Sequence, residues 1–257
     1  MAKIKLPSPS QMGDRLRETE VWKSIFRPGS IYRKGYKDTS RDRALATMNN
    51  VLYHLHPTKV KRHGLKLTYT FCLGGISFFL FILLTLTGVF LMFFFRPMAD
   101  IGGAVAYQDM QAIRTQVFFG DLMRNLHRWG AHLMVLSVTL HMARVFYTGA
   151  YKPPREFNWV VGVVLLFLTL GLSFTGYLLP WDQLAIWAVT VGTSLAGYSP
   201  FIAKQANFLL LGSSVVSPNT LLRWYVFHVI ALPLVTVLFL TVHFWRIRKD
   251  GGISGPL

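Results

Sequence analysis

Four histidines stand in two apolar stretches of the chain. His127 and His141 are 14 residues apart, and His228 and His243 are 15 residues apart. On an α-helix, 14 residues rise about 21 Å and turn to within about 40° of the start, whereas 15 residues rise about 22 Å and end about 60° away. If both stretches are helices, each carries one histidine near either end, on nearly the same face.

Paired imidazoles on facing helices could bind a metal. Haem iron in electron-transfer proteins takes two axial ligands, and histidine is a common one. Zinc would need further nitrogen, sulfur or oxygen ligands, and the sequence offers none at the same heights along the helices as the histidines. The alternative is that the histidines only hydrogen-bond between helices, as intramembrane polar residues can. Because four of them recur at matching intervals, two bis-histidine haem sites are the better interpretation.

Glycines repeat the same interval in two other apolar stretches. Gly74 and Gly88 are 14 residues apart, as are Gly162 and Gly176. Glycine has no side chain, so a flat macrocycle can lie close to the helix backbone. Small residues also serve ordinary helix packing in membranes. The shared interval favours glycines that make room for two haems.

Arginines stand beside two of the histidines. Arg128 follows His127, and Arg144 comes three residues after His141. Haem propionates need cationic partners, and arginine pairs well with carboxylates. The alternative for both is an arginine that reaches along the helix to the membrane interface.

These residues require helices that cross a membrane. The chain has 257 residues, of which 52% are hydrophobic, and a mean hydropathy of +0.39. A membrane-spanning helix needs about 20 mostly apolar residues. Four stretches qualify, at roughly 70–95, 122–148, 158–179 and 222–247. We therefore expect an all-α integral membrane protein, a bundle of four transmembrane helices with two b haems stacked across the bilayer.

The distribution of charge sets the direction of these helices. The net charge is +16, but no nucleic-acid motif accompanies it. With four spans, 21 of the 27 Lys and Arg residues fall on the side of the termini. The positive-inside rule places that side in the cytoplasm or its equivalent. The second and fourth spans then run the same way, so His127 is level with His228 near the outer face and His141 with His243 near the inner face.

Several motifs resemble cytochrome b6 and the N-terminal half of cytochrome b, over about residues 65–257. They are the His-Arg-Trp of 127–129, the two histidine intervals, Gly-Tyr at 176–177, Pro-Trp-Asp-Gln at 180–183 and the C-terminal Ile-Ser-Gly-Pro-Leu of 253–257. The 15-residue interval and the end after four spans are similar to the split b6 type. The resemblance implies two b haems, a low-potential outer haem on His127 and His228 and a higher-potential inner haem on His141 and His243.

The resemblance also implies further sites. Cys72, within Phe-Cys-Leu-Gly-Gly-Ile of 71–76, matches the cysteine that attaches an additional c-type haem through one thioether bond, and Arg248 matches an arginine near that haem. The segment from Tyr177 to Trp187 matches a quinol pocket. Its expected members are Tyr177, Pro180, Trp181, Asp182 and Gln183.

The implied function is that of an electron-transfer subunit, not catalytic alone, in a quinol:cytochrome c or plastocyanin-type oxidoreductase. Its cofactors would be two haem b, the haem on Cys72, and a quinone that is menaquinone, ubiquinone or plastoquinone. Its partners would be a Rieske iron–sulfur protein, a subunit supplying the C-terminal half of cytochrome b, a c-type cytochrome, quinol and membrane lipids, in a dimeric complex. We expect a bacterial plasma membrane, or a thylakoid in a photosynthetic host.

Two other functions stay open at the level of the sequence. One is a dihaem membrane anchor of another quinone-linked dehydrogenase or reductase, and the other is a transporter without haem that has a histidine-lined proton path. Residues 1–64 form a separate basic extension with surface helices, on anionic headgroups or on the cytoplasmic face of the complex. We expect His54, His56 and His63, which lie in it, to be solvated.

Overall fold

The computed structural model describes residues 8–19, 22–23, 39–48, 62–99, 105–198, 203–213, 215–250 and 252. Every regular element in these ranges is a helix. The chain divides into two compact units, one made of residues 1–60 with 247–253 and the other of 61–246 with 254–257. Each is described by itself.

The first unit contains two short helices before the membrane segments, α1 (Pro9–Glu18) and α3 (Ser40–Met48). Ser8 begins α1 with a capping box, because its hydroxyl accepts from the Gln11 N–H while the Gln11 side chain accepts from the Ser8 N–H. Such a cap satisfies two backbone donors at the start of a helix. His54 and His56 lie outside the described residues, as does the side chain of His63. The extent and role of the 1–64 extension stay predictions.

The second unit holds the long helices. They are α6 (Leu73–Met92), α8 (Gly120–Tyr147), α9 (Glu156–Leu178) and a continuous segment from Pro218, made of α12 (Pro218–Val226), η2 (Phe227–Ala231) and α13 (Leu232–Lys249). Three of these four, α6, α9 and Pro218–Lys249, are long and apolar enough to cross a membrane. The chain is therefore an integral membrane protein. The predicted span at 122–148 coincides with α8, which is 28 residues long but more polar. Its crossing stays a prediction.

A π-helical turn interrupts the last long helix at η2, which contains His228. The Leu232 N–H bonds to the Phe227 carbonyl five residues earlier, and Pro233 follows directly and has no N–H to offer a regular α-helical bond. A π turn accommodates one more residue than an α turn. The 15-residue interval from His228 to His243 therefore turns much like the 14-residue interval in α8.

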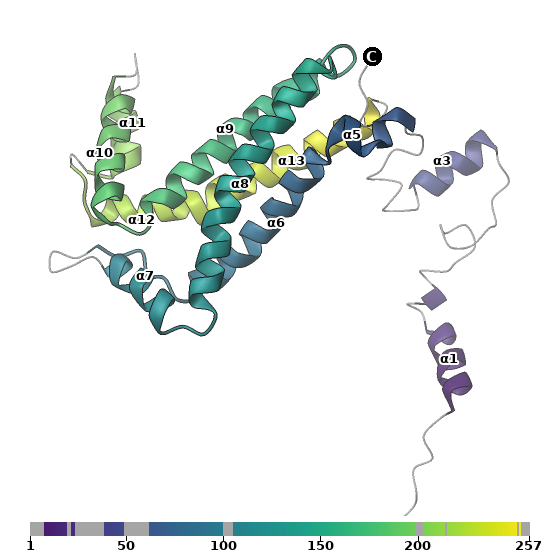
Figure 1. The fold of residues 1–257 in the computed structure, drawn as a ribbon, viewed down its shortest axis with the longest axis horizontal. Helices are drawn as coiled ribbons and strands as arrows, with labels where there is room; N and C mark the ends of the chain where they lie inside the picture. The colour runs from purple at the N-terminus through teal and green to yellow at the C-terminus, as the bar shows by residue number, and fades with distance from the viewer. Residues whose placement is uncertain are drawn as a thin grey trace, which may run out of the picture. The chain divides into compact units, whose positions relative to one another are not determined.

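Close packing joins α6 to α8. A Cβ on Gly130 would lie 3.2 Å from the side chain of Leu84, and the hydroxyls of Ser77 and Ser137 lie 3.0 Å apart across the interface. Figure 1 shows α6, α8, α9 and α13 running alongside one another, with α7 and α10 to α12 gathered at one end. We call it the Gly120 end, because α8 begins there.

Short helices occupy the two long connections: α7 (Val105–Thr115) in the first, and α10 (Gln183–Gly197) and α11 (Ala203–Leu211) in the second. An ion pair fixes α7 to the end of α6. The backbone N–H and guanidinium of Arg96 donate to the Asp109 carboxylate at 2.7–3.0 Å. These hydrogen bonds hold the pKa of Asp109 below its ordinary value. The smaller elements at the opposite end are a 3-10 turn at Arg62–Leu65 and α5 (Leu67–Thr70).

Candidate haem sites

The four predicted histidines come together as two pairs. The ring centres of His127 and His228 are 6.2 Å apart at an interplanar angle of 77°. Those of His141 and His243 are 6.5 Å apart at 79°. A metal bound to one nitrogen of each ring at about 2 Å puts the two ring centres about 6 Å apart. Both pairs therefore have the separation that axial ligation of one metal requires.

Threonines orient both rings at the Gly120 end. The hydroxyls of Thr87 and Thr175 lie 2.9 and 3.0 Å from Nδ1 of His127 and His228. Each hydroxyl donates its own proton to the carbonyl four residues earlier in its helix, at 2.8 and 2.9 Å. The threonine oxygens must therefore accept from Nδ1–H, which leaves the Nε2 lone pair of each ring free to bind a metal. Such a partner fixes the tautomer and raises the basicity of the ligand.

The pair at the other end has no such partners. Nδ1 of His141 and Nδ1 of His243 are both buried, and neither has a hydrogen-bond partner within the described part of the chain. The two sites thus share their ligand type but differ in what holds the ligands.

Each of the four predicted glycines faces one of the four histidines. A Cβ added to the glycine would approach the Cε1 atom of an imidazole at 3.2 Å (Gly74, His141), 3.2 Å (Gly88, His127), 2.7 Å (Gly176, His228) and 4.0 Å (Gly162, His243). Gly162 would also meet the sulfur of Met142 at 3.4 Å. The backbones of α6 and α9 therefore approach the rings closely from both sides, as a flat group between the rings requires.

The donor set fits haem better than a bare metal ion. No group of three or more His, Cys, Asp or Glu side chains that could hold a metal occurs among the described residues. Zinc in proteins is normally held by three or four such ligands. Two imidazoles with glycine backbone beside them match an iron whose other four ligands come from a macrocycle.

Two arginines on α8 carry buried nitrogens without partners. Arg124 is three residues before His127, and its Nε has no hydrogen-bond partner in the described chain; Nε and Nη1 of Arg144, three residues after His141, have none either. The guanidinium of Arg144 lies 5.5 Å from the ring centre of Tyr69. Residues three apart share a helix face, so both arginines lie on the histidine side of α8.

The sequence predicts Arg128, which follows His127 directly, as a cation at a haem, and does not single out Arg124. Arg128 is exposed, and the next residue along a helix points about 100° away from its neighbour. The signal for Arg124 was available, because its spacing of three from His127 mirrors that of Arg144 from His141. A role for Arg128 at a haem stays a prediction.

Comparisons with known proteins identify the family. The family model described as cytochrome b/b6/petB matches residues 59–251. The chain is 46% identical to cytochrome b6 of Heliobacterium modesticaldum over 202 residues, which cover 79% of this chain and 91% of that protein. It is 43% identical to the menaquinol:cytochrome c reductase cytochrome b subunit of Bacillus subtilis, over 74% of this chain and 83% of that one. The chain belongs to the cytochrome b/b6 family. This family binds b-type haem.

A solved structure supports the same fold. A chain of the hyperthermophilic respiratory Complex III matches with a TM-score of 0.67 and 27% identity, over 85% of this chain. The chain spans 55% of the length of that one.

Cys72, where the family resemblance predicts a covalent haem, begins α6. It is an exposed free cysteine with a left-handed backbone conformation, φ 51°. It precedes Gly74 by two residues, so it lies at the helix end that faces His141. Arg248 lies in α13, five residues beyond His243, and is half-buried.

The predicted quinol segment divides into buried and exposed residues. Trp181 is 7% exposed and packs in the hydrophobic core, with a positive φ of 52°. Asp182 caps α10, since its carboxylate accepts from the Ala185 N–H at 2.8 Å. Pro180 is half-buried and Gln183 exposed, and Tyr177 is 52% exposed. Trp181 and Asp182 thus shape the segment, and Tyr177 and Gln183 are the side chains open to a ligand.

Proposed function

We propose that the chain is the dihaem cytochrome b subunit of a quinol-oxidising complex, with four transmembrane helices and both termini in the cytoplasm. The observation that carries the proposal is the pairing of four histidines at 6.2 and 6.5 Å between ring centres. Each ring also has a glycine backbone beside it. Cytochrome b relatives share the family, and one of them is named as a subunit of a menaquinol:cytochrome c reductase.

Each group of residues has a task in this proposal. His127 and His228 hold the outer b haem, and His141 and His243 hold the inner one. The four glycines leave space for the rings. The haems, when bound, supply one-electron transfer between the two membrane faces. The protein contributes ligation, spacing and electrostatics.

The propionates of the haems would find their cations on α8. Arg124 serves the outer site and Arg144 the inner site, because each presents a buried guanidinium nitrogen that lacks a partner within the described residues. A buried charge without a counterpart is costly. A haem carboxylate beside each would remove that cost through a charge-assisted hydrogen bond.

Quinol would be oxidised at the outer face, beside the segment from Tyr177 to Trp187. One electron would leave through a Rieske iron–sulfur partner towards a c-type cytochrome. The other would cross to a quinone at the inner face, so that protons released outside and taken up inside build a gradient. The C-terminal half of cytochrome b would come from a separate subunit, in a dimeric complex.

A third haem on Cys72 belongs to the same proposal. An exposed thiol at the end of α6 nearest His141 supports it, and the family resemblance alone implies Arg248 as a cation for this haem. The test is acid-acetone extraction of the denatured protein followed by haem staining of a gel. The parent should stain and Cys72→Ala should not, and a parent that stays blank would rule out the covalent haem.

A reduced-minus-oxidised spectrum of the purified chain tests the dihaem assignment. Two b-type components are expected, and His141→Ala should remove the inner one while sparing the outer one. A chain with no b-type absorbance would end the proposal and favour the proton-path transporter. The dihaem anchor of another dehydrogenase would keep the spectrum, but family membership favours the quinol-oxidising complex.

A further inference from the structure

One intramembrane histidine takes no part in the paired sites. His132 is exposed on α8, and the described contact of its ring is an edge-on approach to Trp129 at 5.6 Å. Nine residues separate it from His141, so the two point in opposite directions on a helix. His132 therefore faces away from the bundle.

His132 also lies deep in the membrane if α8 crosses it. The helix has 28 residues, which is about 42 Å at 1.5 Å per residue. His132 is twelve residues past the first, at about 18 Å, and so within a few ångström of the middle of the helix. Ionisable side chains at this depth almost always face a protein interior, a partner or water.

A line of polar residues leads to His132 from the Gly120 end. Asp121, Asn125, Arg128 and His132 follow at intervals of four, three and four residues, which keep them within about 60° on the helix. Asp121 is already occupied, since the Asn125 amide donates to it at 2.9 Å and Arg114 lies 3.6 Å away. Within the described residues no ion pair involves Arg128 or His132. This face of α8 thus carries an uncompensated cation one turn above a histidine.

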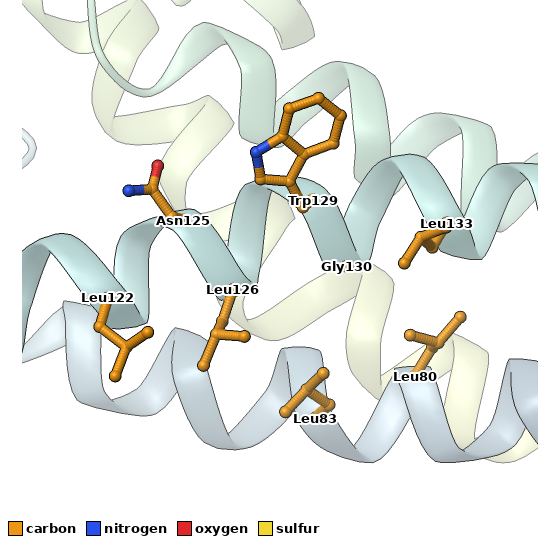
Figure 2. Close-up of a pocket in the computed structure, with 8 residues that line it drawn as sticks. All are labelled: Leu80, Leu83, Leu122, Asn125, Leu126, Trp129, Gly130 and Leu133. Carbon is orange, nitrogen blue, oxygen red and sulfur yellow. The ribbon is translucent and has the colours of Figure 1, made fainter.

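A groove lies beside that line of residues. It has a volume of about 200 Å³ and lies between α6 and α8, lined by Gly130 and by leucines of both helices. Figure 2 shows Asn125 and Trp129 projecting from α8 on the side away from α6, and Leu122 and Leu126 projecting towards α6. The groove is lined mostly by leucine side chains, and its volume suits one large apolar side chain of a neighbouring helix, as in knobs-into-holes packing.

We propose that this face of α8, the line Asp121–Asn125–Arg128–His132 with its neighbouring groove, is the docking surface for a transmembrane helix of a different subunit. That helix carries a carboxylate at the level of Arg128 and His132, and an apolar side chain that fills the groove. Charge complementarity selects this occupant, because arginine stays charged in a low-dielectric medium and neither a lipid tail nor a second copy of the same cationic face can compensate it. The inference rests on the proposed function only in requiring that α8 crosses the membrane, and it needs no haem.

Site-specific photo-crosslinking tests the surface in the intact complex in its own membrane. A benzophenone amino acid replaces His132 or Leu136, with Phe79, an exposed residue of α6, as the control position. We expect crosslinks from 132 and 136, but not from 79, to one transmembrane segment of a different chain, with an Asp or Glu within a turn of the crosslinked residue. Crosslinks to lipid alone, to a second copy of this chain, or to a helix without a carboxylate there would each overturn the proposal.

Two substitutions supply a second readout. His132→Leu should lower severalfold the amount of that subunit retained through a detergent wash, whereas His132→Asn, which can still hydrogen-bond, should retain most of it. Equal retention by both variants contradicts the proposal. A third measurement separates this proposal from the proposed function. If a water-soluble reagent labels a cysteine at position 132 in sealed vesicles, α8 is not in the membrane there, and both the docking surface and the four-span arrangement fail. Crosslinks to lipid alone would overturn only the docking surface.

Discussion

The two histidine pairs are built from the same ligands but held differently. At the Gly120 end, both rings donate Nδ1–H to a threonine hydroxyl. At the other end, both Nδ1 atoms are buried without a partner in the described chain. When the Nδ1–H of a ligating imidazole donates a hydrogen bond, the ring becomes a stronger electron donor to the metal. It then stabilises ferric iron and lowers the reduction potential. Hydrogen bonds to the ligands would therefore give the two proposed haems different potentials, with the lower potential at the Gly120 end, as the family resemblance implies for the outer haem.

Substitutions of the glycines should give the largest difference between the two sites. A Cβ at Gly176 would come within 2.7 Å of the His228 ring, whereas one at Gly162 would stay 4.0 Å from His243. Gly176→Ala should therefore remove most of the outer b-type absorbance, and Gly162→Ala should leave the inner absorbance nearly intact. Potentiometric difference spectra of membranes measure both. Equal losses of absorbance from the two variants would show that the closer approach of Gly176 to His228 does not affect haem binding.

The arginines test the electrostatics of the outer site. Arg124→Gln removes a partly buried cation next to the expected propionate, so the outer potential should fall by tens of millivolts, as a charge interaction at intermediate dielectric implies. Arg128→Gln is the matched control, because Arg128 is exposed and points about 100° away from His127 on α8. Redox titration of the outer haem decides between them. A larger fall for Arg128→Gln would instead support Arg128 as the cation beside the outer haem, as the sequence predicts.

The threonines test the hydrogen bonds themselves. Thr87→Val or Thr175→Val should raise the outer potential by roughly 20–40 mV, since a hydrogen bond contributes about 1 kcal/mol and a tenfold change in a one-electron equilibrium is about 59 mV. Thr87→Ser keeps the hydroxyl and should shift it least. The inner potential, measured in the same titration, should not move. A shift of both haems together would indicate a general loosening of the bundle.

The smallest effect concerns the ion pair that fixes α7 at the Gly120 end. The pKa of Asp109 is lowered by hydrogen bonds from Arg96, so its contribution to stability is fully present above the ordinary carboxyl pKa of about 3.9. That contribution is lost as the pH falls through the lower, folded pKa. Acidification below about pH 4 should therefore loosen the outer site slightly before the inner one, followed as loss of the outer haem spectrum. Asp109→Asn should show less of this acid dependence.

The sequence predicted most of what is periodic in this molecule. The histidine intervals predicted the two pairs and the glycine intervals predicted glycines close to them, because helical geometry converts spacing directly into direction. Three of the predicted spans coincide with helices apolar enough to cross a membrane, and the cytochrome b/b6 family was confirmed.

What escaped prediction depends on contacts between distant segments. Threonine in a membrane helix usually bonds only to its own backbone, so nothing in the sequence marked Thr87 and Thr175 as partners of histidines. The burial of Trp181 in the core is likewise not visible in its motif, and its place at a quinol pocket stays a prediction. The burial of Arg124 beside the histidine face of α8 also depends on packing, and the predicted role of Arg128 stays a prediction. Ligation, quinol binding and the haem on Cys72 stay predictions.

The π turn at Phe227–Ala231 makes the last helix unusually tolerant of a change in length. Deleting Ile230, which lies within that turn, would let it relax into an ordinary α turn, and the residues beyond it would keep their orientation. Deleting a residue between Leu232 and His243 would instead rotate His243 by about 100° out of its pair. Related chains with one residue fewer in this helix can therefore present the same two ligands, and the turn is the place in the fold where such lineages can gain or lose a residue without losing the site.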